Sequence, residues 1–272
     1  MMHGANVQSM AAVVLIRPAG MRFDPHEYAV HCIVSAMRFP GPQYDKVMQW
    51  LHEELRPESY VEIGVHDGHS LKLALPPTKV LGIDPFPVAD HSWRTPTTIL
   101  RMTSSELFAK HRLREFLDVD RFSLAFVDGL HHFDQAIDDI FNLEHYAGPD
   151  SVIAVHDTVP LDEQTSMRER STLFYTGDVW KVIPFLKRCR PDLELVTVRT
   201  GPSGLTLIRR LDPSRERNVA QSEVIGQFQR LSWKYYERHR DDSLETIPNE
   251  RGAVVRWLCG SRGTSVCASP RR

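Results

Sequence analysis

Two apolar segments in the middle of the chain are each followed by acids and histidines. Asp128, His131 and His132 follow the first segment, and His156 and Asp157 follow the second. Carboxylate oxygens and imidazole nitrogens are the ligands that hard and borderline divalent ions take in proteins. An imidazole also titrates near neutral pH, so it can accept a proton from a reacting hydroxyl group. These residues are therefore candidates for a metal site, for a general base, or for both.

A glycine-containing loop follows an earlier apolar segment, in the pattern Glu62-x-Gly64-x-x-x-Gly68-x-Ser70. Glycine tolerates positive φ and the close approach of a ligand, so this loop lets the backbone turn sharply beneath a bound molecule. The next apolar segment ends in Asp84, a carboxylate that can accept hydrogen bonds from ribose hydroxyls at the edge of a sheet. Together the two features indicate an adenosine-containing ligand.

The spacing of this loop argues against a dinucleotide. The dinucleotide motif is Gly-x-Gly-x-x-Gly, whereas here Glu62 occupies the first position and Gly64 and Gly68 lie four residues apart. No pyrophosphate cradle is therefore present. An ordinary turn between a strand and a helix would also account for two glycines and an acid, and the motif alone leaves that alternative open.

Alternating strands and helices must position these residues. The predicted strands cover residues 60–63, 79–83, 98–101, 123–127, 151–155, 193–199 and 205–209. The last two are joined by residues 200–204, too few for a crossover helix, so they must form an antiparallel hairpin. We therefore expect an α/β fold: a Rossmann-like, seven-stranded, mostly parallel sheet closed by that C-terminal hairpin, with helices on both faces. The ends of the parallel strands then bring the acids and histidines beside the glycine loop.

Helical periodicity predicts helices at residues 42–55, 133–146, 178–188 and 222–240. Asp178 is expected to cap the third helix. Asp134, Asp138 and Asp139 are expected on the solvent side of the second.

The chain beyond the predicted sheet is expected to add smaller pieces to one main domain. The domain covers residues 21–211, an appended helical segment covers 212–250, and residues 1–20 and 251–272 are expected to be a disordered N-terminus and a mobile basic tail. Trp233, Tyr235 and Tyr236 give the appended C-terminal helix an aromatic face. That face is expected to pack on the core; covering the active site or contacting a second subunit of a homo-oligomer are the alternatives.

Composition and charge narrow the class of partner. The chain has 272 residues, 42% of them hydrophobic, and a formal net charge of −2, so it can bury a substantial core and does not attract polyanions. A small-molecule substrate is thus favoured over nucleic acid. The cysteines form no Cys-x-x-Cys pair, which argues against a zinc site and a disulfide framework and favours free thiols in a reducing compartment. The apolar residues 10–16 are too few to span a membrane, and a cytoplasmic location is expected.

The glycine loop together with Asp84 resembles the S-adenosylmethionine site of class I methyltransferases. The resemblance implies the strand order 3-2-1-4-5-7-6, a loop that passes the methionine portion of the cofactor, and a ribose bound by Asp84. It also places Ser104 on the adenine side, where capping of the following helix is an equally good interpretation. The residues that it assigns to the cofactor are Glu62, Gly64, His66, Asp67, Gly68, Ser70, Asp84, Ser104 and Asp128.

The motifs Asp128-Gly129-x-His131 and His156-Asp157-Thr158 resemble a branch of that family. The branch includes macrolide-sugar and antibiotic-biosynthesis O-methyltransferases, and the resemblance covers residues 53–211. Its metal-dependent members hold Mg²⁺ or Mn²⁺ with an acid after the fourth strand and a pair of acid or amide residues after the fifth. Carried over, the ligands would be Asp128, His156 and Asp157. A histidine in place of the usual carboxylate disfavours Mg²⁺ and leaves Mn²⁺, Zn²⁺ or no metal open.

The expected function is S-adenosylmethionine-dependent O-methylation of a small polar acceptor, such as a sugar or a secondary metabolite. His131 is the first candidate for the general base and His132 the second. The long polar segments 158–177 and 86–94 are expected to select the acceptor. Two alternatives remain: a metal-dependent oxygenase similar to cephalosporin hydroxylase, and a noncatalytic module that only binds S-adenosylmethionine. Turnover of labelled cofactor would separate the first function from both.

Overall fold

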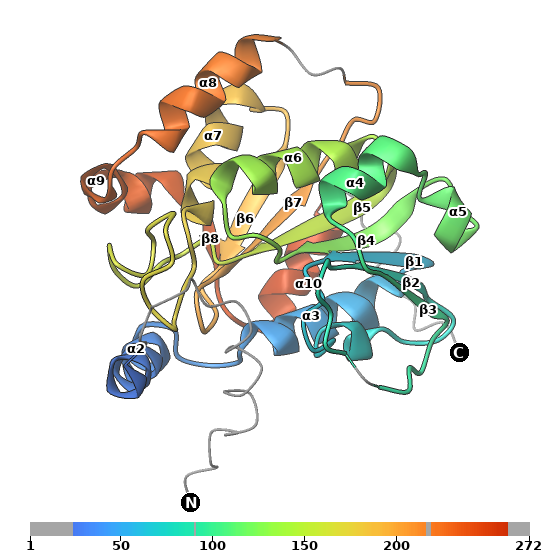
Figure 1. Cartoon of the computed structure of the whole chain (residues 1–272), viewed down its shortest axis with the longest axis horizontal. Helices are drawn as coiled ribbons and strands as arrows, with labels where there is room; N and C mark the ends of the chain where they lie inside the picture. The colour runs from blue at the N-terminus through green and yellow to red at the C-terminus, as the bar shows by residue number, and fades with distance from the viewer. Residues whose placement is uncertain (1–23, 90, 216–218, 261–272) are drawn as a thin grey trace, which may run out of the picture.

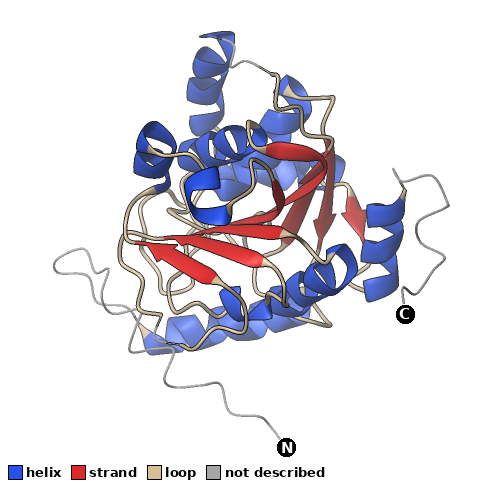
Figure 2. Cartoon of the chain, turned by 90° about the vertical axis from the view of Figure 1, so that its right-hand side faces the viewer, coloured by secondary structure: helices blue, strands red, loops and turns tan. Residues whose placement is uncertain are grey.

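The computed structural model describes residues 24–89, 91–215 and 219–260. A central eight-stranded sheet has helices on both faces (Figures 1 and 2). The strands are β1 (Ser59–Ile63), β2 (Lys79–Ile83), β3 (Thr97–Leu100), β4 (Phe122–Val127), β5 (Ala147–His156), β6 (Glu194–Val198), β7 (Leu205–Arg209) and β8 (Thr246–Ile247). Their order is β3-β2-β1-β4-β5-β7-β6-β8, so the predicted order of the first seven strands is confirmed.

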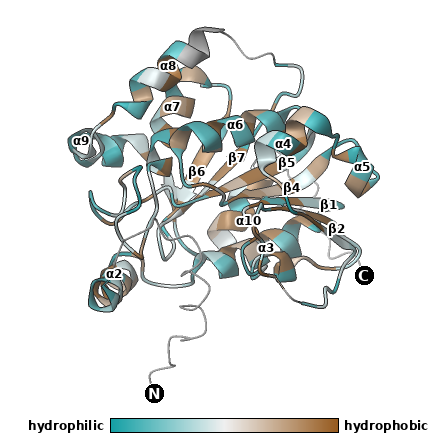
Figure 3. Ribbon diagram, viewed as in Figure 1, coloured by the Kyte–Doolittle hydropathy of each residue, from teal (hydrophilic) through white to brown (hydrophobic). Residues whose placement is uncertain are grey.

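The central strands are parallel and buried on both faces. In register, Val61 of β1 lies opposite Leu81 of β2 and Ala125 of β4, and all three side chains are buried. Continuous apolar runs suit strands that helices cover on both sides. Figure 3 shows apolar residues along the strands and hydrophilic residues on the outer side of the helices. β7 is the exception in direction: it runs antiparallel between β5 and β6, as the short 200–204 connection requires.

Two apolar layers flank the sheet. One side carries α4 (Ser104–Lys110), α5 (Arg114–Leu117), α6 (Phe133–Glu144), α7 (Val182–Cys189) and α8 (Val219–Gln229). The other side carries α3 (Tyr44–Leu55), the short 3₁₀ helix η2 (Leu71–Leu73) and α10 (Arg251–Cys259). The strand ends are thereby held between two layers of packed side chains, and the polar residues that follow them emerge at one edge.

Helix α2 (Pro25–Arg38) precedes this core and lies against the long segment 158–177 (Figure 1). Asp24 begins the helix as a side-chain cap, and Pro25 occupies its first turn, where a missing amide hydrogen costs nothing. His31 Nε2 lies 3.1 Å from Asp162 Oδ2, and Arg38 Nη1 donates to the carbonyl of Leu161 at 2.6 Å. Sequence periodicity did not predict this helix, because many of its apolar residues face outward.

The predicted helix 222–240 is two helices, α8 and α9 (Trp233–Ser243). The amide of Leu231 donates to Phe228 O, and Ser232 adopts the extended backbone of an N-cap, so the chain begins a new helix there. The expected packing of the aromatic face is found: the Tyr236 ring lies 5.1 Å from that of Trp180. The two-residue strand β8 that follows α9 was not predicted, because two residues show no periodicity.

The first residues of the expected mobile tail, 251–272, form a helix instead. Arg251–Cys259 forms α10, whose Ala253, Val254 and Leu258 are buried against α3. The arginine-rich composition of residues 251–272 obscured the apolar helical pattern of α10 in the sequence. Residues 261–272, like the expected disordered residues 1–20, lie outside the described part of the chain. Cys259 is disulfide-bonded, contrary to the expectation of free thiols, whereas Cys32 and Cys189 are free.

Two expectations about acids near α6 are also wrong. Asp178 does not cap its own helix, which begins as the 3₁₀ turn η3 (Val179–Lys181); its Oδ1 instead accepts from the amide of Phe133 at 2.8 Å and so caps α6. Asp139 is buried rather than solvated and accepts from Gln135 Nε2 at 2.9 Å. Within the described residues no helix is long and apolar enough to cross a membrane.

Candidate active site

The C-terminal ends of β1, β2, β4 and β5 meet at one edge of the sheet and carry the predicted site residues. Three of the six non-glycine residues with positive φ in the described chain lie there: His66 at 47°, His131 at 46° and Asp157 at 60°. Such backbone conformations are disfavoured and cluster at functional sites. At this edge the fold therefore holds three residues in backbone conformations that non-glycine residues rarely adopt.

Asp84 fixes the glycine loop at the end of β2. Its Oδ2 accepts from the amides of Val65 at 3.0 Å and His66 at 2.8 Å, and its Oδ1 accepts from the amide of Phe86 at 2.7 Å. A carboxylate oxygen has two lone pairs, so Oδ1 can accept one further hydrogen bond. The side chain is partly exposed. Asp84 thus both shapes the loop and offers an acceptor atom to a ligand.

Glu62 lies beneath the loop instead of facing it. Its side chain is 0% exposed, and it accepts from Tyr60 Oη at 2.6 Å and from Ser70 Oγ at 2.7 Å. Burial raises the pKa of Glu62 to about 8, although the two hydroxyl groups lower it. Glu62 and Ser70, both predicted to bind the cofactor, form a buried hydrogen-bonded pair that supports the loop from within.

Gly64 is required by the protein backbone itself. Its φ is 91°, and a Cβ atom there would lie 2.0 Å from the carbonyl oxygen of Asp128. Gly68 has φ of 74°, and a Cβ there would lie 2.5 Å from the ring of Trp93. Only glycine permits both the conformation and the contact. The loop after β1 is therefore packed directly on the loop after β4, which joins the two halves of the site.

Other predicted cofactor residues are spread around this loop. His66 and Asp67 are exposed, with His66 Nδ1 3.9 Å from Asp67 Oδ1. Ser104 is the first residue of α4 and is nearly buried. The cap of that helix is Thr103, which forms a capping box with Glu106, so the capping role considered for Ser104 belongs to its neighbour.

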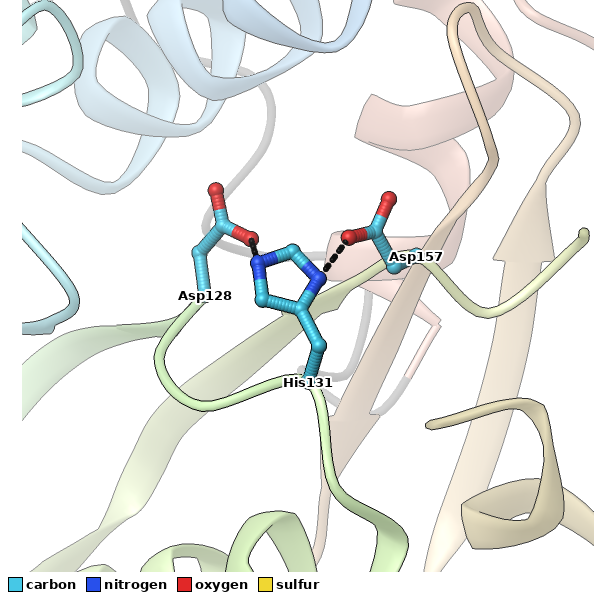
Figure 4. Close-up of side chains that lie close together, drawn as sticks. All are labelled: Asp128, His131 and Asp157. Carbon is cyan, nitrogen blue, oxygen red and sulfur yellow. Dashed lines mark ion pairs between the residues drawn. The ribbon is translucent and has the colours of Figure 1, made fainter. Parts of the chain in front are cut away.

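Asp128, His131, His156 and Asp157 form one cluster at the ends of β4 and β5. His131 lies between the two carboxylates: its Nδ1 is 2.6 Å from Asp157 Oδ2, and its Nε2 is 3.9 Å from Asp128 Oδ1 (Figure 4). His156 Nδ1 lies 3.2 Å from Asp128 Oδ1 and 3.4 Å from Asp157 Oδ1. The two imidazoles thus neutralise two carboxylates in a confined space.

The electrostatics of the cluster follow from burial and charge pairing. Burial alone would lower the pKa of both histidines, but the charges of Asp157 and Asp128 outweigh it and raise the pKa of His131 and of His156. Burial alone would raise the pKa of Asp157, but His156 and His131 lower it. The carboxylates of the cluster therefore favour the protonated form of both histidines, and the histidines favour the ionised form of Asp157.

Three residues that the sequence did not indicate complete the cluster. Ser203, in the β6–β7 hairpin, donates its hydroxyl to Asp157 Oδ1. The Tyr44 ring lies 4.2 Å from that of His156, and the Tyr175 ring 5.5 Å from that of His131. The antiparallel hairpin prediction was the only signal for Ser203, because it places residues 200–204 beside the end of β5.

The structure groups the predicted ligands differently from the sequence. Asp128, His131 and Asp157 each offer a ligand atom within 4.8 Å of the others, whereas His156, predicted as a ligand, is not in this group. The His156 ring is tilted against that of Tyr44, and its Nδ1 faces both carboxylates. His132, the second candidate base, forms the N-cap position of α6 and does not contact the cluster. A small open pocket borders Asp128, His131 and Asp157.

Comparisons with known proteins are consistent with this arrangement. Residues 61–158 match a family model described as a methyltransferase domain. That range runs from the glycine loop through the acid and histidine cluster. A comparison with curated proteins finds no match.

Several solved structures have a similar chain path. SAH-bound methyltransferase PaMTH1 from Podospora anserina has 15% identity and a TM-score of 0.43, covering 78% of this chain and 99% of its own. The O-methyltransferase TomG from Streptomyces achromogenes, in complex with SAM, has 15% identity and a TM-score of 0.44, covering 77% and 99%. The O-methyltransferase from Bacillus cereus, in complex with SAH, has 14% identity and a TM-score of 0.43, covering 75% and 97%. These values are too low to assign a ligand to this chain.

Proposed function

Because residues 61–158 are a methyltransferase domain, we propose that this chain transfers a methyl group from S-adenosylmethionine to an oxygen atom of a small polar acceptor, such as a sugar or a secondary metabolite. The observation that carries the proposal is the packing of the Gly64 loop on the Asp128 backbone, which sets a cofactor loop directly beside a proton-accepting cluster. The net charge of −2 favours a small molecule over nucleic acid as acceptor.

The cofactor supplies an electrophilic methyl group on a positively charged sulfur. The acceptor oxygen attacks the methyl carbon, the bond between that carbon and sulfur breaks, and the hydroxyl proton must leave. The chain therefore has to align the oxygen and take its proton. The loop fixed by Asp84 binds the cofactor, with His66 and Asp67 at its exposed side.

His131 is the residue that takes the proton. Its Nδ1 faces Asp157 at 2.6 Å, while its Nε2 lies 3.9 Å from Asp128, too far for a hydrogen bond, and borders the pocket. Once His131 has lost its proton, Nε2 is the nitrogen that can accept a proton from a hydroxyl group. The carboxylate of Asp157 then stabilises the imidazolium, as an acid beside a catalytic histidine does.

The same residues fit a divalent ion in their chemistry. Asp128, His131 and Asp157 supply two oxygens and one nitrogen, a donor set that suits Mn²⁺ or Zn²⁺ better than Mg²⁺. Such an ion would gather acceptor oxygens and lower the pKa of the reacting hydroxyl. In the structure the His131 ring stands between the carboxylates (Figure 4). Ion binding would have to displace the proton and the ion pairs of that histidine.

Calorimetry with the purified chain tests the proposal. S-adenosylmethionine and S-adenosylhomocysteine should bind and NAD should not. Asp84→Asn should weaken binding roughly tenfold to a hundredfold, because it removes a charged hydrogen-bond acceptor. Asp118→Asn is the matched control, since Asp118 is an exposed aspartate that pairs with Lys79 at the start of β2. Binding of NAD in place of S-adenosylhomocysteine would overturn the assignment.

A further inference from the structure

Three arginines lie at or near the ends of the elements that adjoin Tyr236. Arg38 ends α2, Arg199 directly follows β6, and Arg240 lies one turn after Tyr236 in α9. The charges of all three arginines act on the Tyr236 hydroxyl, and those of Arg199 and Arg240 also act on Arg38. Arg38, Arg199 and the α9 pair Tyr236 and Arg240, which come from three distant parts of the sequence, thus share one neighbourhood.

Hydrogen bonds and packing hold these elements together. Ser35 Oγ of α2 donates to the carbonyl of Pro202 in the β6–β7 hairpin at 2.8 Å. Leu244, at the end of α9, packs against the apolar cluster that contains Phe39, at the end of α2. The amide of Thr197 in β6 donates to the carbonyl of Glu245 at 2.7 Å. The ends of α2, β6 and α9 are therefore fixed against one another.

The Tyr236 hydroxyl lacks a partner that a buried hydroxyl normally has. Tyr236 is 4% exposed, and its Oη makes no hydrogen bond within the described residues. Buried polar side-chain atoms in proteins are nearly always hydrogen-bonded. The ring packs on Trp180 and Trp233, so apolar contacts account for the ring but not for its hydroxyl group.

The three arginines carry more positive charge than the nearby carboxylates of Asp162 and Asp241 can offset. Among the described residues, Arg199 makes no hydrogen bond or ion pair, and Arg38 donates only to the carbonyls of Pro160 and Leu161. Arg240 lies 3.9 Å from Asp241, whose side chain is 84% exposed. Asp162 acts on Arg38 but pairs with His31. Positive charge therefore gathers beside a free hydroxyl donor.

We propose that Arg38, Arg199, Arg240 and Tyr236 form a binding site for an oxyanion, either a carboxylate or a phosphate group. The planar guanidinium group presents paired donors that match the oxygens of both groups. The Tyr236 hydroxyl would donate to the same anion and so gain the missing partner. We call these four residues the anion site.

The position of the anion site points to the acceptor as the source of the anion. β5 and β6 both run antiparallel to β7, which lies between them, so their C-terminal ends are at the same edge of the sheet. Neighbouring strands are about 4.8 Å apart, which puts Arg199 roughly 10 Å along the edge from the end of β5 and Asp157. An acceptor with an anionic group about that far from its hydroxyl would reach both. This assignment rests on the proposed function, whereas the anion site does not.

The test titrates the full chain with inorganic phosphate in a calorimeter at constant ionic strength. Arg199→Met and Tyr236→Phe should each weaken phosphate binding roughly tenfold to a hundredfold, because each removes a hydrogen bond to a charged group. Tyr236→Phe keeps the aromatic packing, so it separates the hydroxyl from the fold. Arg210→Met is the matched control: Arg210 also follows a strand end, but at the opposite edge, and it pairs with Glu194 at 3.1 Å.

Each outcome decides a separate point. Equal phosphate binding by wild type, Arg199→Met and Tyr236→Phe, or no heat beyond that of a chloride control, would overturn the anion site. Phosphate that competes with the acceptor in methyl transfer would identify the anion as part of the acceptor. Phosphate that binds without changing the acceptor KM would identify a free anion. Phosphate binding in a chain that does not bind S-adenosylmethionine would refute the proposed function and leave the anion site standing.

Discussion

The carboxyl group of Glu62 couples proton binding to folding. Burial raises its pKa to about 8 in the folded chain, against the ordinary value of 4.5 for a glutamate. Between these values the folded state holds a proton that the unfolded state loses, so the free energy of unfolding falls as pH rises. The slope for one group is at most about 1.4 kcal/mol per pH unit.

Glu62→Gln should remove this dependence while keeping the hydrogen bonds to Tyr60 and Ser70. Urea unfolding from about pH 5 to about pH 8 should show wild-type stability declining relative to the variant. Glu58→Gln, at an exposed acid just before β1, is the control and should follow the wild type. Parallel curves for wild type and Glu62→Gln would mean that Glu62 titrates as an ordinary surface acid.

Two mechanisms are possible for the cluster around His131, and they predict different effects of a chelator and of substitutions on the rate. If His131 is a metal-free base, a chelator should have no effect and His131→Ala should lower the rate roughly a hundredfold to ten-thousandfold. The rate should then rise with pH through a pKa above the ordinary 6.5, because Asp157 and Asp128 raise the pKa of His131. If a metal is required, the chelator should abolish transfer, and added metal should restore only the wild type, not Asp157→Ala. Full activity in both variants would exclude this cluster from catalysis.

For individual residues, the sequence predicted which side chains lie at the same edge of the sheet but not the contacts that they make. Asp84, Asp128 and Asp157 could be found because each follows an apolar strand at a shared edge. Glu62 looks like a ligand-facing acid in the sequence, and only the packing of Tyr60 and Ser70 shows that it is enclosed. The rotamer that turns His131 between two carboxylates depends on positive φ at a non-glycine residue, which sequence patterns do not reveal.

The contact between the loops after β1 and β4 makes Gly64 a structural position. We expect Gly64→Ala to destabilise the fold by about 1 to 3 kcal/mol or more, because of its φ of 91° and the Asp128 carbonyl, and to weaken cofactor binding as a result. Thermal unfolding with and without S-adenosylhomocysteine measures both. Gly226→Ala, in α8 with open space around it, should instead be neutral or stabilising. Unchanged stability in Gly64→Ala would show that the two loops can separate.

Helix α10 contributes through its apolar side and not through its charges. Leu258→Ala should cost about 2 to 5 kcal/mol, because Leu258 is 7% exposed and packs in the layer formed with α3. Arg251→Ala should cost less than about 1 kcal/mol, since its pairs with Glu53 and Glu54 are at the surface. Denaturant unfolding of both variants compares the two contributions directly. A larger loss in Arg251→Ala would contradict this ranking.

Elements with a long apolar period could be predicted, and those defined by tertiary contacts could not. Apart from β3, which is only partly buried, the predicted strands and α3 were found because each has a buried face of several residues. Helix α10 was missed because it has only three buried residues, which lie among two arginines and a glycine. Helix α2 was missed because its outward side is apolar. Its inward face is held by polar contacts, such as that of Ser35 with Pro202, which a hydrophobic pattern does not reveal.

Across the whole molecule, the sheet order divides the site into two halves. β1 and β2, with Asp84 and the glycine loop, form the cofactor half, and β5, β7 and β6 form the acceptor half; β4 and Asp128 lie between them. The family match covers the first half and the cluster, but it ends at residue 158. Under the proposed function, we expect the acceptor half, with segment 158–177, the hairpin and the proposed anion site, to determine the specificity for the acceptor.

The contacts of α2 also bear on the order in which the chain can fold. His31 meets Asp162 across 131 residues, and Ser35 meets Pro202 across 167. Closing such long loops costs more entropy than pairing strands that are neighbours in sequence, so these contacts form late. During synthesis, β1, β2 and β4 can assemble before Asp162 and Pro202, the contact residues of α2, have been added to the chain. The acceptor side of the proposed site would then be the last part to fold.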